Sequence, residues 1–172
     1  MIIHCIFNDE QGSYCYNPEL VERLVEANAW VNPTLYAFQS AIEHMELKKI
    51  EDGLSENEKK SLAQNKRDLE TRIESVHKMN NDGVGIVAGS DSPWGYYPPG
   101  EFIHEMEYLE RAGLSTLEAL LSGTSWSAES IGLRDSTGSI MEDGNADLVV
   151  VKNDASKGVG ALWDVIDVYQ AG

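Results

Sequence analysis

Two side chains in this sequence, one inside and one just after a stretch that predicts a strand, belong to types that bind metals or transfer protons. Asp91 comes shortly after the apolar run 84–88, whose flanking glycines and branched residues predict a strand buried on both faces. A carboxylate at such a strand end loses water, which is tolerated where it meets a cation, a metal or several donors. Asp91 is therefore a candidate for chemistry, and the open alternative is a cap of the following turn.

His4 is the second candidate, and its residues alone favour a structural role. It lies in the apolar stretch 1–7, which predicts another strand. A lone histidine in an apolar strand is more often a hydrogen-bonded core residue than a ligand. His44, His77 and His104 fall on predicted helices among charged residues, and we expect them to be ordinary helix-surface side chains.

Composition limits the classes of partner. The chain has 172 residues, so a single domain is the default, and its net charge is −16. Such an acidic chain is a poor match for nucleic acid or an anionic membrane, because both attract basic surfaces. Composition alone does not identify the partner, and the small-molecule substrate expected of the parent protein is implied by a resemblance given below.

The cysteines and the apolar runs indicate a cytoplasmic protein. Cys5 and Cys15 show no metal-ligand spacing and are interpreted as reduced thiols, although a disulfide closing this short loop stays open. The N-terminal residues lack the basic region and cleavage site of a signal peptide. No apolar run approaches the ~18 residues that a membrane-spanning helix needs.

The first half of the sequence predicts strands that alternate with helices, a pattern typical of a parallel sheet. Asn17 followed by Pro18 predicts a helix start after the first strand. Residues 30–36 predict the second strand, and residues 38–80 predict a long charged helical region with a capping box at Ser55.

The second half predicts helices and then a different kind of sheet. A helix is expected over residues 101–112, a short one after the capping box that starts at Ser115, and another capped by Thr124. Residues 138–152 predict a strand, a turn and a strand, and residues 163–169 predict one more strand.

Motifs in the second half resemble the C-terminal half of the metal-dependent amidohydrolase superfamily. The corresponding sequence motifs of the superfamily are close to GTD, then AGLSPLEAL, then GSI followed by GKLADLVVL. The segments here, in the same order, are GIVAGSDS (85–92), AGLSTLEALLSGT (112–124) and GSIMEDGNADLVVV (138–151). Upstream, IIHC and VNPTL resemble the sixth and seventh barrel strands, and the imidazolonepropionase and Xaa-Pro dipeptidase-like branches are the most similar.

The resemblance implies an α/β fold in two parts. Residues 1–135 would form the C-terminal part of a TIM (β/α)8 barrel, with its last three strands and their helices. Residues 136–172 would form part of a small β-sandwich domain.

The resemblance also implies roles for individual residues. Asp91 matches the aspartate after the eighth strand, which binds the metal and acts as general base. His4 matches the sixth-strand histidine, which binds a second metal or contacts substrate. The expected cofactor is a divalent metal, most simply zinc, and Trp94 is a candidate substrate contact beside His4.

The remaining ligands of the superfamily have no counterpart in these residues, so whether this chain is an enzyme by itself stays open. The first interpretation is a C-terminal fragment of an amidohydrolase whose parent hydrolyses an amide, cyclic amide or peptide-like C–N bond. The alternatives are a half-barrel that associates with itself or with an N-terminal partner, and an acidic interaction module without activity.

Overall fold

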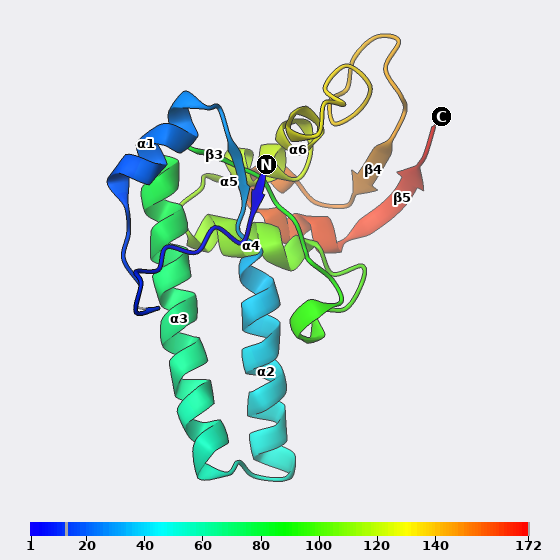
Figure 1. Cartoon of the computed structure of the whole chain (residues 1–172). Helices are drawn as coiled ribbons and strands as arrows, with labels where there is room; N and C mark the ends of the chain where they lie inside the picture. The colour runs from blue at the N-terminus through cyan, green and yellow to red at the C-terminus, as the bar shows by residue number, and fades with distance from the viewer. Residues whose placement is uncertain (13, 172) are drawn as a thin grey trace.

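A computed structural model describes residues 1–12 and 14–171, and its centre is a small parallel sheet (Figure 1). The strands are β1 (Ile2–Ile3), β2 (Trp30–Asn32) and β3 (Gly85–Ile86). They are hydrogen-bonded in the order β1-β2-β3, with both pairs parallel. All three carboxyl ends therefore lie at one edge of the sheet, with the end of β2 in the middle.

The strands are shorter than the sequence predicts. β1 covers only two of the residues 1–7, and β2 ends at Asn32 because Pro33 follows and Thr34 adopts a left-handed backbone. Residues 35 and 36, which were predicted to continue this strand, instead open a helix. Parallel pairing itself is as predicted.

The connection from β1 to β2 contains α1 (Pro18–Glu26), which begins as the sequence predicts. The side chain of Asn17 accepts a hydrogen bond from the Leu20 N–H group at 3.0 Å. Asn28 takes a left-handed conformation just after the helix, and Val21 and Leu24 face the core.

The region from 38 to 80, predicted as helical, belongs to an antiparallel hairpin of two helices, α2 (Leu35–Glu51) and α3 (Glu56–Asn81), which extends away from the sheet (Figure 1). The predicted capping box at Ser55 starts α3, with Ser55 and Glu58 satisfying each other's backbone N–H groups. The buried side chains of α3 recur at helical spacing: Leu62, Leu69, Ile73, Val76 and Met79.

After β3 come a short 3-10 turn, η1 (Trp94–Tyr96), and the helices α4 (Ile103–Arg111), α5 (Thr116–Ser122) and α6 (Ser125–Ser130). The capping box at Ser115 is confirmed. Thr124 precedes α6 as predicted, but its hydroxyl donates to the Leu120 carbonyl at 2.7 Å and does not cap the helix.

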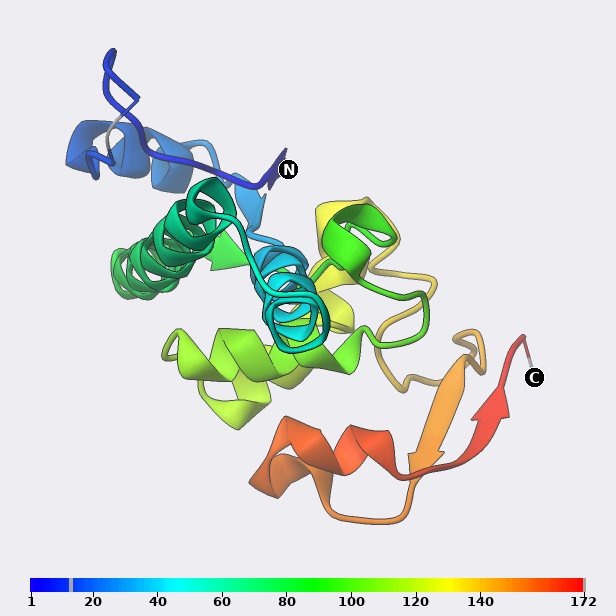
Figure 2. The same cartoon turned by 90° about the horizontal axis from the view of Figure 1, so that it is seen from below.

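The tail forms an antiparallel pair, β4 (Leu148–Val151) and β5 (Val165–Tyr169). Residues 138–141 were predicted as a strand and are not one, and the side chain of Ile140 is exposed. Between the strands, η2 (Ala155–Lys157) and η3 (Val159–Trp163) lie against α4 and α5. Figure 2 shows α4 between the helical hairpin and this tail.

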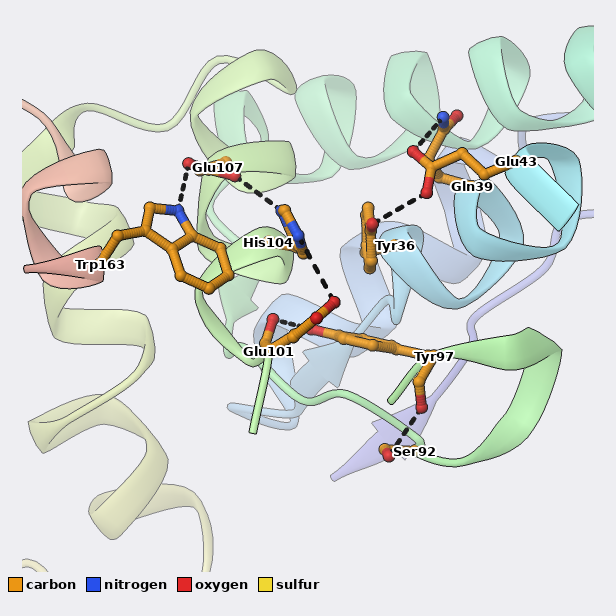
Figure 3. Close-up of polar contacts among 9 residues, drawn as sticks. All are labelled: Tyr36, Gln39, Glu43, Ser92, Tyr97, Glu101, His104, Glu107 and Trp163. Carbon is orange, nitrogen blue, oxygen red and sulfur yellow. Dashed lines mark hydrogen bonds and ion pairs between the residues drawn. The ribbon is translucent and has the colours of Figure 1, made fainter. Parts of the chain in front are cut away.

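An aromatic and polar cluster joins α2, α4 and the tail (Figure 3). His104 of α4 stacks on Tyr36 of α2, with ring centroids 4.2 Å apart, and contacts Trp163 at 4.6 Å. Glu107 accepts a hydrogen bond from the Trp163 indole at 2.9 Å and pairs with His104 at 3.0 Å. His104, expected to be an ordinary surface residue, is thus a packing centre.

Two predictions concern membrane-spanning segments and the state of the cysteines. In the described part of the chain, no helix is both long and apolar enough to cross a membrane. Cys5 and Cys15 are both free thiols, and burial raises the pKa of Cys5.

Candidate functional site

The ends of the three parallel strands bring His4, Thr34 and Asp91 together. His4 follows β1, Thr34 follows β2 by two residues, and Asp91 follows β3. The Nε2 atom of His4 lies 3.6 Å from Oδ2 of Asp91, with about two fifths of each side chain exposed (41% and 38%). The carboxyl edge of a parallel sheet is where such folds place reactive groups. Both residues singled out in the sequence therefore lie in one candidate site.

All three residues have left-handed backbone conformations. Their φ angles are 71° for His4, 51° for Thr34 and 52° for Asp91. Histidine and aspartate tolerate this region moderately well, but a β-branched threonine there is an outlier. Such conformations cost about 1–3 kcal/mol each and concentrate at functional sites. Their coincidence at three adjacent strand ends marks this edge as specialised.

Thr34 determines which nitrogen of His4 holds a proton. The Thr34 hydroxyl donates to the Pro33 carbonyl at 2.8 Å, so its oxygen is left to accept. His4 Nδ1 lies 2.7 Å from that oxygen and must be the donor. In the neutral ring Nε2 then has a free lone pair, and this is the atom that faces Asp91. This arrangement prepares a metal-ligating or proton-accepting histidine.

Glu105 performs the capping role that Thr34 does not. Thr34 is the N-cap residue of α2, yet its side chain makes no capping hydrogen bond. Instead, the fully buried carboxylate of Glu105 accepts from the N–H groups of Leu35 (2.9 Å) and Tyr36 (2.8 Å). A carboxylate at this position also interacts favourably with the helix dipole. Because Glu105 caps α2, the Thr34 hydroxyl is available to His4.

Burial dominates the acidity of Glu105. Desolvation raises its pKa to about 7, while the backbone hydrogen bonds from Tyr36, Leu35 and Thr34 act in the opposite direction. No cation pairs with this carboxylate in the described part of the chain. The cap is therefore a group whose charge changes near neutral pH.

Asn32 and Gly89 pack tightly behind the site. A Cβ atom at position 89 would lie 1.9 Å from Asn32 Nδ2, so only glycine leaves room for this amide. The Oδ1 atom of Asn32 is buried and has no hydrogen-bond partner among residues 1–12 and 14–171. An unsatisfied buried acceptor at a strand end is a feature that a bound group or a further segment could satisfy.

The donor chemistry of this pair fits part of a divalent-metal site. An imidazole nitrogen with a free lone pair and a carboxylate are both ordinary ligands of zinc, but a catalytic zinc uses three protein ligands. Within residues 1–12 and 14–171, no group of three histidine, cysteine or acidic side chains has a metal-binding arrangement. The pair could supply two of the three protein ligands that a catalytic zinc uses.

The Phe38 ring links Trp94 to His4 of the candidate site. The Phe38 ring lies 6.4 Å from the His4 ring and 5.3 Å from the Trp94 ring, centroid to centroid. Trp94 is half exposed. Phe38, Ala41 and Trp94 line a cavity of about 190 Å³ together with polar side chains of α3, namely Asn65, Asp68 and Arg72. Figure 3 shows the neighbouring loop, where Ser92 is hydrogen-bonded to the Tyr97 carbonyl.

The residues that support the pair were not predicted. Thr34 lies inside the segment 30–36 that was predicted as a strand, and its position just after Pro33 is the one signal that could have identified it. Glu105 is separated from Leu35 by 70 residues, and its sequence neighbours indicate only an amphipathic helix.

The chain is similar to a family profile and to several solved structures. The profile described as "Amidohydrolase family" matches residues 8–168. No curated protein sequence matches the chain at a significant level.

Solved structures of about the same fold cover nearly the whole chain. A Xaa-Pro dipeptidase with bound methionine in its active site is 24% identical, with a TM-score of 0.76 over 99% of this chain. A prolidase from Bifidobacterium longum is 23% identical, with a TM-score of 0.78 over 99%. The A. niger ochratoxinase is 22% identical, with a TM-score of 0.69 over 99% of this chain and 35% of its own. The chain spans about two fifths of the length of the first two, 38% and 40%.

Proposed function

Because this chain belongs to the amidohydrolase family, we propose that His4 and Asp91 form part of a divalent-metal site for hydrolysis of an amide, cyclic amide or peptide-like C–N bond. The observation that most directly supports this is the 3.6 Å approach of His4 Nε2 to Asp91 Oδ2 at the carboxyl edge of the sheet, where they follow the two strands that flank β2. Family membership supports C–N bond hydrolysis by a metal-dependent enzyme as the class of reaction. Zinc and the identity of the substrate are parts of the proposal.

Each side chain has a distinct task in this proposal. Asp91 Oδ2 accepts a proton from the attacking water and later delivers it to the nitrogen of the leaving amine. His4 presents the Nε2 lone pair, and Thr34 holds the ring through Nδ1. A bound divalent metal would supply an acidified water and a Lewis acid for the scissile carbonyl.

The proposed architecture assigns residues 1–135 to the last three strands and helices of a (β/α) barrel. The parallel order β1-β2-β3 and the likeness to longer solved structures support it. Residues 136–172 are proposed to be part of a β-sandwich, which the separate antiparallel pair β4–β5 supports.

Completion of the site requires residues beyond this pair, and the surface supports such a complement. β1 is an edge strand, and Ile2 and Ile3 are 40% and 51% exposed. Every residue of β5 is exposed as well. We propose that a further segment or a second copy covers these strands, since exposed apolar edges favour pairing.

Metal binding by the 172-residue chain tests the proposal. Isothermal titration with Co²⁺ or Zn²⁺ is expected to give weak binding, with no hydrolysis of dipeptides or N-acyl amino acids by the chain alone. D91N and H4Q should each weaken binding at least tenfold, whereas D147N, in the tail, should not. Equal binding by wild type, D91N and H4Q would refute the ligand assignment. Binding of one equivalent of zinc, together with substrate turnover by this chain alone, would refute the proposal that the site is incomplete.

A further inference from the structure

The guanidinium group of Arg72 has no ion-pair partner in the part of the chain that the structure describes. Arg72 lies on α3, and its Nη1 atom is buried with no hydrogen-bond partner. Among the described residues, Arg72 forms no ion pair and donates no hydrogen bond, although desolvation already lowers its pKa. A partly buried, unpaired charge is costly, and proteins normally provide it with a counter-charge.

The contacts that Arg72 does make are with an aromatic ring. Its guanidinium carbon lies 3.8 Å from the centroid of the Phe38 ring, a cation–π arrangement. This contact holds the planar group in place but supplies no acceptor for its N–H donors. Asp68, one turn earlier on α3, attracts Arg72 without an ion pair, and its carboxylate accepts from Gln64 at 2.7 Å.

Arg72 is connected to the candidate site by shared cavities. One cavity of about 20 Å³ is lined by both His4 and Arg72, which is room for a single water. A second, of about 190 Å³, has Arg72, Phe38 and Trp94 in its wall. An aromatic wall beside a fixed guanidinium suits a small group that is apolar on one side and anionic on the other.

We infer that Arg72 binds a carboxylate located on the leaving-amine side of the substrate. In an N-acyl amino acid or a dipeptide, that carboxylate is three bonds from the scissile carbonyl carbon, within about 4 Å. His4 and Arg72 line the same small cavity, and the Phe38 ring lies beside both of them, its centroid 6.4 Å from the His4 ring centroid and 3.8 Å from the Arg72 guanidinium carbon. A carboxylate held by Arg72 would therefore leave the rest of a short substrate on the side of His4. A guanidinium holds a carboxylate through two parallel N–H donors. The inference rests on the proposed function only in treating this carboxylate as part of a substrate.

The test compares a ligand with and without the charge, in the absence of metal. N-acetyl-L-proline and N-acetyl-L-prolinamide are titrated into the ¹⁵N-labelled chain, and the Arg72 Nε–H resonance is followed. We expect the acid to bind at least tenfold more tightly than the amide and to shift this resonance. R72Q should abolish the preference, and R72K should retain only part of it because lysine lacks the planar fork.

R67Q is the matched control, since Arg67 lies on the same helix, is exposed and contacts Gln64. It should keep the full preference for the acid. Equal binding of acid and amide to wild type would overturn the inference without any variant, and so would a preference that survives in R72Q. Because no metal or turnover is involved, this outcome is separate from failure of the ligand assignment to His4 and Asp91.

Discussion

Glu105 caps the helix that begins at Leu35, although the two residues are 70 positions apart in the chain. A helix N-terminus is usually capped by the residue just before it, which here is Thr34. The Thr34 hydroxyl is instead engaged with Pro33 and His4. The capping of α2 and the orientation of the candidate metal ligand are therefore linked through one threonine.

Replacing Glu105 by glutamine should remove a pH dependence of stability. Glu105 has an ordinary pKa of 4.5 and a folded pKa of about 7, so the native state binds more protons between these values. The free energy of unfolding should therefore fall as pH rises toward 7, and the loss is complete above it. Between pH 5.5 and 7.5 this contribution is about 2 kcal/mol, since each pKa unit equals about 1.36 kcal/mol.

Urea unfolding of wild type and E105Q at pH 5.5, 6.5 and 7.5 measures this difference. The gap between the two proteins should shrink as pH rises, because E105Q lacks the titrating group but loses an N–H acceptor at every pH. E22Q, on the exposed side of α1, is the control and should follow wild type. A constant gap between wild type and E105Q would contradict a raised pKa at Glu105.

Replacing Thr34 by valine should change the protonation of His4 without changing the shape of the side chain. Valine keeps the β-branch but offers no oxygen to Nδ1, so the proton is no longer held there. We expect ¹⁵N shifts of the neutral ring to show Nδ1–H in wild type and a mixture of both tautomers in T34V. In a completed site, loss of such an orienting partner weakens metal binding about 10- to 100-fold.

T34S separates the hydroxyl from the methyl group. It retains the acceptor for His4 and should keep the Nδ1–H tautomer. Identical ring nitrogen shifts in T34V and wild type would show that Thr34 does not orient the histidine.

Substitution of Gly89 by alanine should strain the packing behind the site. The new Cβ would lie 1.9 Å from Asn32 Nδ2, so the amide must move. Overpacking of this kind costs about 1–3 kcal/mol. The double variant N32A/G89A should recover part of the loss, as measured by thermal unfolding, because the clashing amide is absent. G160A is the control, since its Cβ would meet only Glu107 Oε1, at 3.7 Å. If the stability losses of N32A and G89A simply add in the double variant, the proposed clash is wrong.

Local chemistry made part of this fold predictable. The helix starts at Asn17, Ser55 and Ser115 depend on side chains within a few residues, and all three are confirmed. Asp91 became a candidate because it follows a predicted strand and matches a family motif, whereas His4 became one only through the motif. Long-range contacts could not be predicted from the sequence. Residues 35–36 have strand-like types, yet a carboxylate 70 positions away caps the helix that they begin.

The last prediction concerns how the tail is attached. Trp163 of η3 donates to Glu107 at 2.9 Å and contacts His104, as Figure 3 shows, so it links residues 155–163 to α4. W163A should remove both contacts and speed amide hydrogen exchange in η2 and η3, while α3 keeps the protection of wild type. W163F keeps a ring but no N–H donor, and its exchange rates should lie between the two. If residues 136–172 form a unit of their own, β4 and β5 should retain their mutual protection in W163A. Exchange that rises equally in the tail and in α3 would instead show that Trp163 stabilises the chain as a whole.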